Sequence, residues 1–493
     1  MTNPFSVIAV VSLITATVGI GLYGLRFSRT TSDFFVASRS VRPFANATAI
    51  SGEYLSAASF MGIAGLVMVY GIDMLWYPVG YTVGYLVLLV LIAAPLRRSG
   101  AYTLPDFAEA RMESRVVRRI SSVLVVSIGW LYLLPQMQAA GVTLHLMTGA
   151  PIASGGIVVA LVVGLTVMAG GMRSITLVQS FQYWLKLIAI AVPTVLIAWA
   201  WTRAGSPVLG PDRWSEPLSG FAGRDHPFYN NFSLVMATFL GTMGLPHVLV
   251  RFYTIRNGRA ARRTTLNVLV LLSAFYVFPP VLGALGRHYA PDLLAGGNTD
   301  SVVLMLPERV FSGIPGELLG ALVAAGAFAA FLSTASGLVL SIAGVISQDL
   351  LAKRVGAVRG FRIGTAIAVA APLLLSLQIR EQSLAEMVAM AFAVAASTFC
   401  PLLVLGIWWR ALSTAGAVAG LIVGGVTSLG AVVTALFIPT HGLLNTLLVQ
   451  PAAWSVPLAF ATMLLVSRAT PQLVPLNAAI TLGRLHTPDR FVD

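Results

Sequence analysis

Charged residues are scarce in this chain of 493 residues. Asp, Glu, Lys and Arg make up only 10% of it, whereas hydrophobic residues make up 57%. Soluble globular domains carry about 25% charged residues. Apolar stretches long enough to cross a bilayer recur from one end of the chain to the other. The composition therefore excludes an ordinary soluble protein and predicts an integral membrane protein without a separate globular domain.

Cysteine is also nearly absent. The single cysteine, Cys400, excludes an internal disulfide and a cysteine-held metal cluster, and its apolar surroundings predict a packing role. His145 and His441 stand near the predicted outer ends of spans, and no spacing of His, Cys and carboxylates is typical of a metal enzyme. Neither a Walker loop nor a G-x-S-x-G motif occurs. These absences argue against an enzyme and against transport driven by ATP.

The net charge of +13 could indicate a nucleic-acid binder, but the arginines are dispersed over many connecting segments. Most of the 31 Lys and Arg fall in alternate connections between predicted spans. By the positive-inside rule the arginine-rich side is cytoplasmic, which places the N-terminus outside and the C-terminus inside. Hydropathy predicts thirteen spans: 4–25, 44–70, 74–95, 117–147, 152–169, 176–201, 230–250, 265–285, 318–346, 364–377, 384–409, 411–437 and 453–466.

The predicted span 44–70 carries a carboxylate near its middle. Glu53 stands in the run AISGEYLSAASFMGIA (residues 49–64). A charged side chain at the bilayer centre costs about 2.5 to 3.5 kcal/mol on insertion scales, so it persists beside a polar cavity, a partner or an ion. Ser51 and Gly52 weaken the helix there. The pattern predicts a broken helix whose freed carbonyls line a polar site. The alternative is a packing helix whose carboxylate is satisfied by a neighbour.

A second interruption is predicted in the span 230–250, which contains GTMGLPHVLVRF (residues 241–252). Pro246 removes a backbone donor and clashes with the preceding turn, and Gly241 and Gly244 loosen the same stretch. If each interrupted span opens a block of five spans, the two occupy corresponding positions and enter the membrane from opposite sides. Such pairs indicate a transporter site between inverted repeats, although proline kinks without function also occur in membrane helices.

The span 318–346 supplies small polar residues on one helix face. Ala330, Ser333, Thr334 and Gly337 recur at spacings of three or four residues. Two hydroxyls, together with carbonyls from an unwound neighbour, make a hard oxygen cage that suits a small alkali cation. Hydroxyls in membrane helices also bond their own backbone or a packing partner. The Ser333–Thr334 pair alone therefore leaves both interpretations open.

Together these segments resemble the sodium:solute symporter family, and more closely its acetate-permease or monocarboxylate branch. The resemblance rests on SDFFVASRSV (32–41), NATAISGEYLSAASFMGIAGLV (46–67), GTMGLPHVLVRF, and the Ser333–Thr334 pair followed by ISQDL (346–350). It covers nearly the whole chain. It implies an all-α polytopic membrane protein whose core contains two inverted five-helix repeats, each with a broken first helix. The implied units are an N-terminal helix and cytoplasmic loop (1–43), the ten-helix core (44–409), two C-terminal helices (410–468) and a cytoplasmic tail (469–493).

The resemblance also implies where an ion binds. The implied sodium ligands are the carbonyls of Gly52, Leu55 and Ala330 and the hydroxyls of Ser333 and Thr334. Ser56 falls where relatives place a hydroxyl that is important for coupling. The branch usually reads GDY at the break, whereas this chain reads GEY, with Glu53 in the middle. The start of the span 176–201 lacks the Asp that relatives with other substrates carry, which argues against a second cation site.

A monocarboxylate needs a donor-rich pocket, which unwound helix N-termini with hydroxyl and amide side chains can supply. The candidates for substrate binding or coupling are Glu53, Tyr54, Ser56, Ser59, Gln136, Gln138, Gln179, Gln182, Lys186 and Thr242. Lys186 shares a helix face with Gln179 and Gln182. It pairs the substrate carboxylate or Glu53, or it extends toward the cytoplasmic interface. Pro246, His247 and Arg251 are predicted to have a gating or structural role near the cytoplasmic end.

The sequence thus predicts a non-enzymatic, multi-pass transporter of a bacterial-type plasma membrane. It imports a short monocarboxylate, such as acetate, propionate or pyruvate, with sodium as the coupling ion and with no other cofactor and no nucleic-acid partner. Two alternatives stay open: a proton-coupled symporter of a small organic solute in which Glu53 titrates, and sodium-coupled uptake of an amino acid of the proline type. A sensor lacks support because no signalling domain is attached, and paired breaks favour alternating access over a passive channel.

Overall fold

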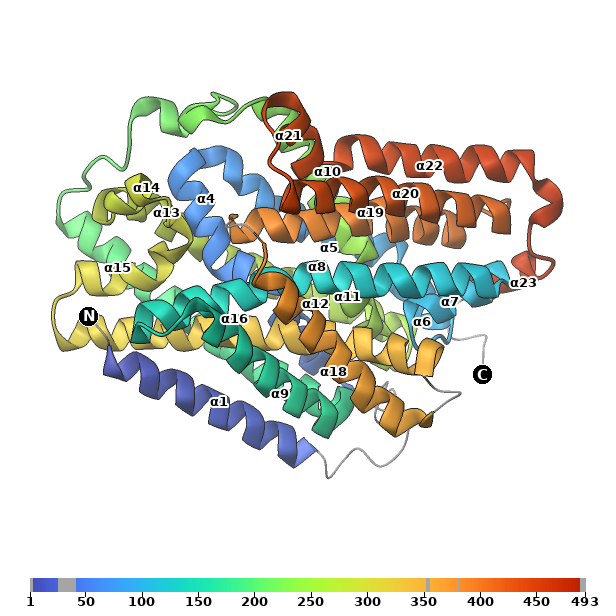
Figure 1. Cartoon of the computed structure of the whole chain (residues 1–493), viewed down its shortest axis with the longest axis horizontal. Coiled ribbons are helices and arrows are strands. Elements are labelled where there is room, and N and C mark those ends of the chain that lie inside the picture. The colour runs from blue at the N-terminus through green and yellow to red at the C-terminus, as the bar shows by residue number, and fades with distance from the viewer. Residues whose placement is uncertain (1–2, 25–40, 352–354, 380–381, 488–493) are drawn as a thin grey trace.

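The computed structural model describes residues 3–24, 41–351, 355–379 and 382–487, and every regular element among them is a helix (Figure 1). The predicted all-α fold class is confirmed. Most of the motif at 32–41, most of the predicted first cytoplasmic loop and the end of the tail lie outside the described residues.

Eleven helical stretches in the described ranges are long and apolar enough to cross a membrane. The α-helices are α1 (Pro4–Gly24), α3 (Pro43–Tyr54), α4 (Ile63–Tyr70), α5 (Trp76–Leu91), α6 (Ala93–Arg98), α7 (Leu104–Met112), α8 (Arg115–Thr148), α9 (Ile152–Arg203), α10 (Pro227–Gly244), α11 (Pro246–Val250), α12 (Gly258–Tyr276), α13 (Phe278–Tyr289), α14 (Asp292–Gly296), α15 (Val302–Val310), α16 (Ile314–Val345), α18 (Ala357–Ser376), α19 (Leu384–Trp408), α20 (Thr414–Phe437), α21 (Gly442–Val449), α22 (Ala452–Ala469) and α23 (Ala478–His486).

Helix α9 is one continuous element that makes two passes. Its 52 residues would extend about 78 Å if straight, far beyond a hydrocarbon core of roughly 30 Å. Gly171 interrupts it with φ 57° and ψ −167°, a conformation that favours glycine. Gly21 of α1 lies against Thr166 before this point and accepts a hydrogen bond of 2.7 Å from Ser174 after it. The chain therefore turns back at Gly171.

A second reversal occurs at Gly71, where φ is 72°. Beyond it α5 returns alongside the end of α3, so that the rings of Tyr85 and Tyr54 lie 4.8 Å apart. A Cβ at Gly71 would overlap the carbonyl oxygen of Trp214, so this turn requires glycine. With these two reversals the eleven stretches make thirteen passes, as the sequence predicts.

Both predicted interruptions are present. Helix α3 ends at Tyr54, Leu55 leaves the helical region with ψ 85°, and a π-helix (Ala58–Gly62) leads into α4. Helix α10 ends at Gly244, Leu245 is extended with ψ 115°, and α11 restarts at Pro246. Proline at the first turn of α11 has no amide that needs a partner, which is why the helix restarts there.

The two broken elements pack in equivalent ways. Gly52 on α3 lies against the carbonyl of Gln179, in the second half of α9, and Gly241 on α10 lies against the carbonyl of Phe392 in α19. In each block the first pass thus contacts the fifth through a glycine, which lets membrane helices approach closely. Because five passes separate the breaks, the two blocks have opposite orientations in the membrane. This arrangement confirms the predicted inverted repeats.

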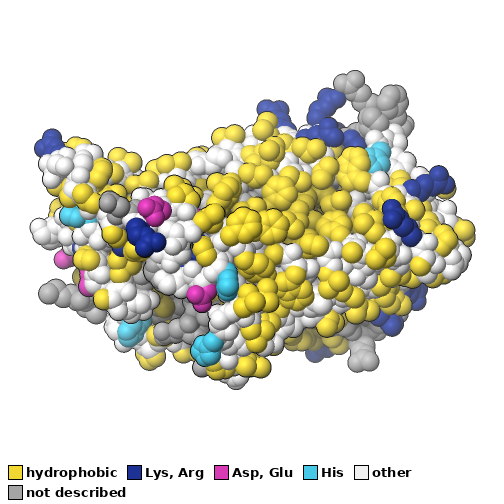
Figure 2. Space-filling view, turned by 90° about the horizontal axis from the view of Figure 1, so that it is seen from above, with side chains coloured by type: hydrophobic (Ala, Val, Ile, Leu, Met, Phe, Trp, Pro, Cys, Tyr) yellow, Lys and Arg dark blue, Asp and Glu magenta, His cyan; other side chains and the backbone are white. Residues whose placement is uncertain are grey.

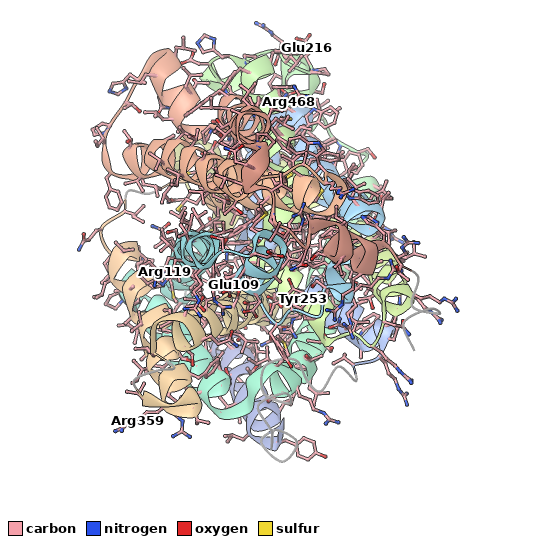
Figure 3. The ribbon with its side chains drawn as sticks, turned by 90° about the vertical axis from the view of Figure 1, so that its right-hand side faces the viewer. Glu109, Arg119, Glu216, Tyr253, Arg359 and Arg468 are labelled. Carbon is pink, nitrogen blue, oxygen red and sulfur yellow. The ribbon has the colours of Figure 1, made fainter. Side chains whose placement is uncertain are left out.

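Charge is distributed unevenly between the two ends of the bundle. Hydrophobic side chains cover its middle, and Lys and Arg gather mostly toward the end where the C-terminus lies, opposite the N-terminus (Figures 1 and 2). Figure 3 views this arginine-rich end, where the exposed side chain of Arg359 points away from the bundle. Arg118 on α8 lies there too, bonded to Glu109 at 2.6 Å and to Asp349 at 2.7 Å.

Candidate transport site

A cluster of oxygen atoms lies where the break after α3 meets α16. The hydroxyl of Ser333 lies 2.7 Å from the carbonyl oxygen of Gly52 and 3.1 Å from that of Ala330. The carbonyl of Leu55, freed by the break, belongs to the same cluster through a shared partner described below. Thr334 instead donates to the carbonyl of Glu53 at 2.6 Å. The structure thus brings together Gly52, Leu55, Ala330 and Ser333, four of the five residues that the resemblance implied as sodium ligands, whereas Thr334 bonds the neighbouring Glu53 carbonyl.

The shared partner is the ammonium group of Lys186, from the second half of α9. Its Nζ donates to the Leu55 carbonyl and to the Ser333 hydroxyl at 2.8 Å each, and also to the Gly52 carbonyl. The side chain is fully buried. The interpretation in which Lys186 extends toward the cytoplasmic interface is therefore wrong, because the freed carbonyls of the break hold the ammonium inside.

Glu53 has a different partner from those suggested by the sequence. Arg251, which follows α11, donates from Nε to Glu53 Oε2 at 2.8 Å, and both side chains are at most 1% exposed. The same guanidinium bonds Thr176 at 2.8 Å and also the amide oxygen of Gln179. Arg251 therefore links the first broken helix to the second and to α9. His247, one turn earlier, takes no part in this network.

Two neighbours shape the space around Glu53. A Cβ at Gly337 on α16 would lie 2.6 Å from Glu53 Cγ, so glycine leaves room for the carboxylate. Gln179 donates to the carbonyl of Ser333 at 2.8 Å, which fixes its amide beside Arg251. The oxygen Glu53 Oε1 is buried and has no hydrogen-bond partner among the described residues.

Aromatic rings pack together between the two breaks, and we call the place where they meet the chamber. Tyr54, the last residue of α3, contacts Tyr81, Tyr85 and Phe392 with ring centroids 4.8 to 6.0 Å apart. Its hydroxyl bonds that of Thr242 on α10 at 2.8 Å. The first broken helix thus meets the second through a tyrosine–threonine contact. Both residues were predicted from the sequence as candidates for substrate binding or coupling.

Several other candidates line or support this chamber. Gln136 on α8 accepts a hydrogen bond of 3.0 Å from the amide of Ala57, just after the break. Ser59 bonds the hydroxyl of Tyr276 at 2.9 Å. Ser56 is fully buried. Gln182 instead bonds Thr17 of α1 at 3.2 Å, away from the chamber.

Buried polar atoms without a partner mark the chamber within the described part of the chain. They are the hydroxyls of Ser56, Tyr81 and Tyr85 and both ring nitrogens of His247. The ring of Tyr132 joins this group, since its centroid lies 5.2 Å from that of His247 and 5.7 Å from that of Phe392. Buried polar groups normally find hydrogen bonds. These atoms are therefore free to hydrogen-bond a water molecule or a solute.

Sequence reasoning missed Tyr81, Tyr85, Tyr132, Tyr276 and Phe392. One signal was available: Tyr77, Tyr81 and Tyr85 recur at intervals of four, which places three tyrosines on one face of α5. The glycines at 80 and 84 bring that helix close to Thr238 and Thr242 on α10. The other three aromatic residues carry no local pattern that separates them from packing residues.

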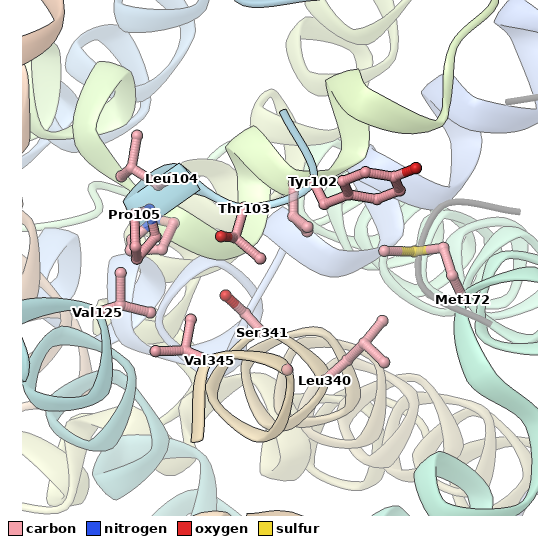
Figure 4. Close-up of a pocket in the computed structure, with 12 residues that line it drawn as sticks. Tyr102, Thr103, Leu104, Pro105, Val125, Met172, Leu340, Ser341 and Val345 are labelled. Carbon is pink, nitrogen blue, oxygen red and sulfur yellow. The ribbon is translucent and has the colours of Figure 1, made fainter. Parts of the chain in front are cut away.

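A pocket opens between the break in the second repeat and the arginine-rich end (Figure 4). Thr103 and Ser341 lie opposite each other across it, and Met172 and Leu340 line its wall. Met172 also contacts the guanidinium of Arg251 at 3.0 Å. The pocket thus lies beside the network that joins Arg251 to Glu53.

The connection before α10 packs against α4 and the turn that follows it. Trp214 donates to the carbonyl of Val67 at 3.1 Å, and the amide of Leu218 donates to Asp73 at 3.1 Å. Arg224 lies 3.6 Å from the same carboxylate. These contacts attach the connection to α4 and to Asp73, while most of its described residues are exposed.

An all-α bundle of inverted repeats, with two broken helices around a buried polar chamber, defines the class of secondary transporters. The sodium:solute symporter family model matches residues 34–424, and the chain belongs to this family. Among curated proteins, it is 29% identical over 430 residues to the uncharacterized symporter YwcA of Bacillus subtilis (strain 168), with 85% of this chain and 84% of that protein covered.

Solved structures show the same fold. A sodium-coupled sialic acid symporter in a substrate-bound, outward-open state matches with a TM-score of 0.72 at 16% identity, covering 94% of this chain and 97% of its own. Mhp1, a nucleobase-cation-symport-1 family transporter in a closed conformation with bromovinylhydantoin bound, matches with a TM-score of 0.60 at 15% identity, covering 92% and 99%. The chain is therefore a transporter and not an enzyme.

Proposed function

We propose that this protein imports a short monocarboxylate together with sodium by alternating access. The observation that carries the proposal is the chamber between the two helix breaks, where unpartnered hydroxyls face aromatic rings. Membership of a family of sodium:solute symporters supports sodium as the coupling ion. The sodium-coupled sialic acid symporter of the same fold adds to that support.

The chamber favours a small anion with one carboxylate. Ser56, Tyr81 and Tyr85 offer hydroxyl donors, and the charge of Arg251 is already neutralised by Glu53. A hydrogen bond to a charged group contributes about 1.5 to 3 kcal/mol, so two or three such donors replace much of the water around one carboxylate. The aromatic rings around Tyr54 supply an apolar surface for a short aliphatic group.

We place sodium in the oxygen cluster of Gly52, Leu55, Ala330 and Ser333, with the adjacent hydroxyl of Thr334 as a fifth ligand. The cluster borders the same break as the chamber, because Tyr54 lies between Leu55 and Glu53 in the chain. An ion and a solute that stabilise one conformation of this break favour each other's binding. Such coupling is typically worth about 1 to 3 kcal/mol and is reciprocal.

We further propose that the arginine-rich end is cytoplasmic, with the N-terminus outside in a bacterial-type plasma membrane. The pocket of Figure 4 then faces the cytoplasm, and the Arg251–Glu53 pair acts as a gate next to it. Pro246 and His247 belong to the same moving element. The transport unit is the core of residues 44–409.

Uptake of labelled acetate, propionate, pyruvate and proline into proteoliposomes tests the proposal. An imposed sodium gradient should drive accumulation of at least one monocarboxylate, and proline should not accumulate. Accumulation driven only by a proton gradient would reject sodium coupling, and accumulation of proline alone would reject the substrate class.

A further inference from the structure

The ammonium of Lys186 lies where the proposed sodium ion would lie. Its three hydrogen-bond acceptors are Gly52, Leu55 and Ser333, all of them members of the oxygen cluster. An ammonium with three donors and no acceptor fits such a cage as a sodium ion would. Elsewhere the chain uses arginine for positive charge, since lysine stands only at 186 and 353. The lysine at this buried position therefore departs from the general use of arginine in the chain.

A sodium ion and this ammonium cannot share the cluster. Both carry one positive charge, both need the same carbonyl oxygens, and the surroundings are fully buried, so their repulsion is weakly screened. The residues present therefore fit a cation, but in this conformation the protein supplies that cation itself.

We propose that Lys186 is a tethered cation that competes with sodium for a single position. This inference rests on the proposed sodium site. When sodium leaves toward the cytoplasm, the ammonium takes its place on the freed carbonyls of the break. When sodium enters, the ammonium withdraws. The break between α3 and the π-helix therefore holds one positive charge both with and without sodium. Sodium binds more weakly than it would to an empty cluster, because part of its binding free energy is used to displace the lysine.

A second acceptor is available for the displaced ammonium. Glu53 Oε1 is buried without a partner in the described part of the chain, and it lies against Gly337. Gly337 is one helical turn from Ser333 on the same face of α16, a separation of about 5 to 6 Å. The flexible four-carbon stem of a lysine can bridge such a step.

Sodium binding to the purified, full-length protein tests this inference without any organic solute. Thermal unfolding is followed as sodium chloride replaces choline chloride at constant ionic strength. Lys186→Met removes the charge and keeps an unbranched side chain that is one atom shorter. We expect its half-saturating sodium concentration to fall about tenfold or more below that of the wild type. Adding Ser333→Ala to this variant should abolish the sodium response.

Thr194→Val is the matched control, because Thr194 is buried two turns further along α9 and bonds only its own helix, at Ile190. Its sodium response should equal that of the wild type. If Lys186→Met fails to fold, Lys186→Gln, which keeps amide donors for the carbonyls, takes its place and carries the same expectation.

Equal half-saturating concentrations in the wild type and the neutral variants would overturn the inference. A folded neutral variant that loses its sodium response would also overturn it, because the lysine would then support sodium binding. If Lys186→Met binds sodium more tightly but the protein transports no monocarboxylate, only the proposed substrate is rejected. The two failures are therefore distinguishable.

Discussion

Glu53 and Arg251 form an ion pair in the centre of a membrane fold, with both side chains almost wholly buried. We expect Glu53→Gln to destabilise the protein by about 3 to 5 kcal/mol, because it leaves a buried guanidinium without its charge partner. Glu53→Gln combined with Arg251→Met should recover part of this loss. Denaturation in detergent measures both effects. A double variant no more stable than the single one would contradict the pairing.

The sequence singled out Glu53 but did not identify its partner. A carboxylate at bilayer depth signals that Glu53 has a partner or a polar site. The partner, Arg251, is 198 residues away, and the sequence predicted only a gating or structural role for it. Lys186 was ambiguous for the same reason, since its partners are backbone carbonyls freed by a distant break. Such contacts depend on packing between passes, which periodicity within one helix does not encode.

At the scale of the element, α5 presents Tyr81 and Tyr85 to the chamber with hydroxyls that lack a partner in the described structure. We expect Tyr81→Phe and Tyr85→Phe each to raise the KM for the monocarboxylate about tenfold or more, through loss of a hydrogen bond to a charged group. Uptake kinetics measure the change. Tyr183→Phe removes a hydroxyl that bonds Leu271 instead and should leave KM unchanged. Equal effects in all three variants would contradict a direct role.

The first amide of helix α19 donates a hydrogen bond to a carboxylate that lies far away in the sequence. Asp300, between α14 and α15, accepts a hydrogen bond of 2.9 Å from the amide of Leu384. The residue as a whole is partly exposed, but its Oδ1 is buried without a partner in the described structure. Burial raises the pKa of the Asp300 carboxyl to about 7, and the nearby charge of Glu386 adds to that rise.

Stability should therefore fall as pH rises through this pKa. The folded protein binds a proton at Asp300 between about pH 4 and pH 7 that the unfolded chain has already released. We expect the unfolding midpoint of the wild type, relative to Asp300→Asn, to decrease from pH 5 to pH 8. The midpoint of the wild type relative to Asp292→Asn, a variant at a surface carboxylate bonded to Arg309 at 2.7 Å, should show no such decrease. A wild type that gains stability over Asp300→Asn in this range would contradict the assignment.

Elements were easier to predict than contacts. Glycine and proline act on the local backbone, so both breaks could be located from the sequence. The reversal at Gly171 also falls in the predicted gap between spans 152–169 and 176–201. The π-helix after the first break could not be predicted. Nor could the hydrogen bonds of the connection before α10, because only the fold brings their partners Val67 and Asp73 close.

At the scale of the whole molecule, the distribution of arginine predicts orientation. The one cysteine of the chain, Cys400, is buried, so introduced cysteines report on their own positions. We expect Gly296→Cys, at the end of α14, to react with a membrane-impermeant maleimide in intact cells. Gly483→Cys, in α23 at the arginine-rich end, should react only after permeabilisation. Both glycines have open space around them. The reverse pattern would place the N-terminus inside.

The central claim is that one site beside the first break couples sodium to solute. Uptake of a labelled monocarboxylate into proteoliposomes, measured against sodium concentration for the wild type and for Ser333→Ala combined with Thr334→Ala, tests it most directly. The account predicts that the double variant loses sodium-driven accumulation while it still inserts and folds. Sodium dependence that stays intact in the double variant would show that the coupling ion binds elsewhere.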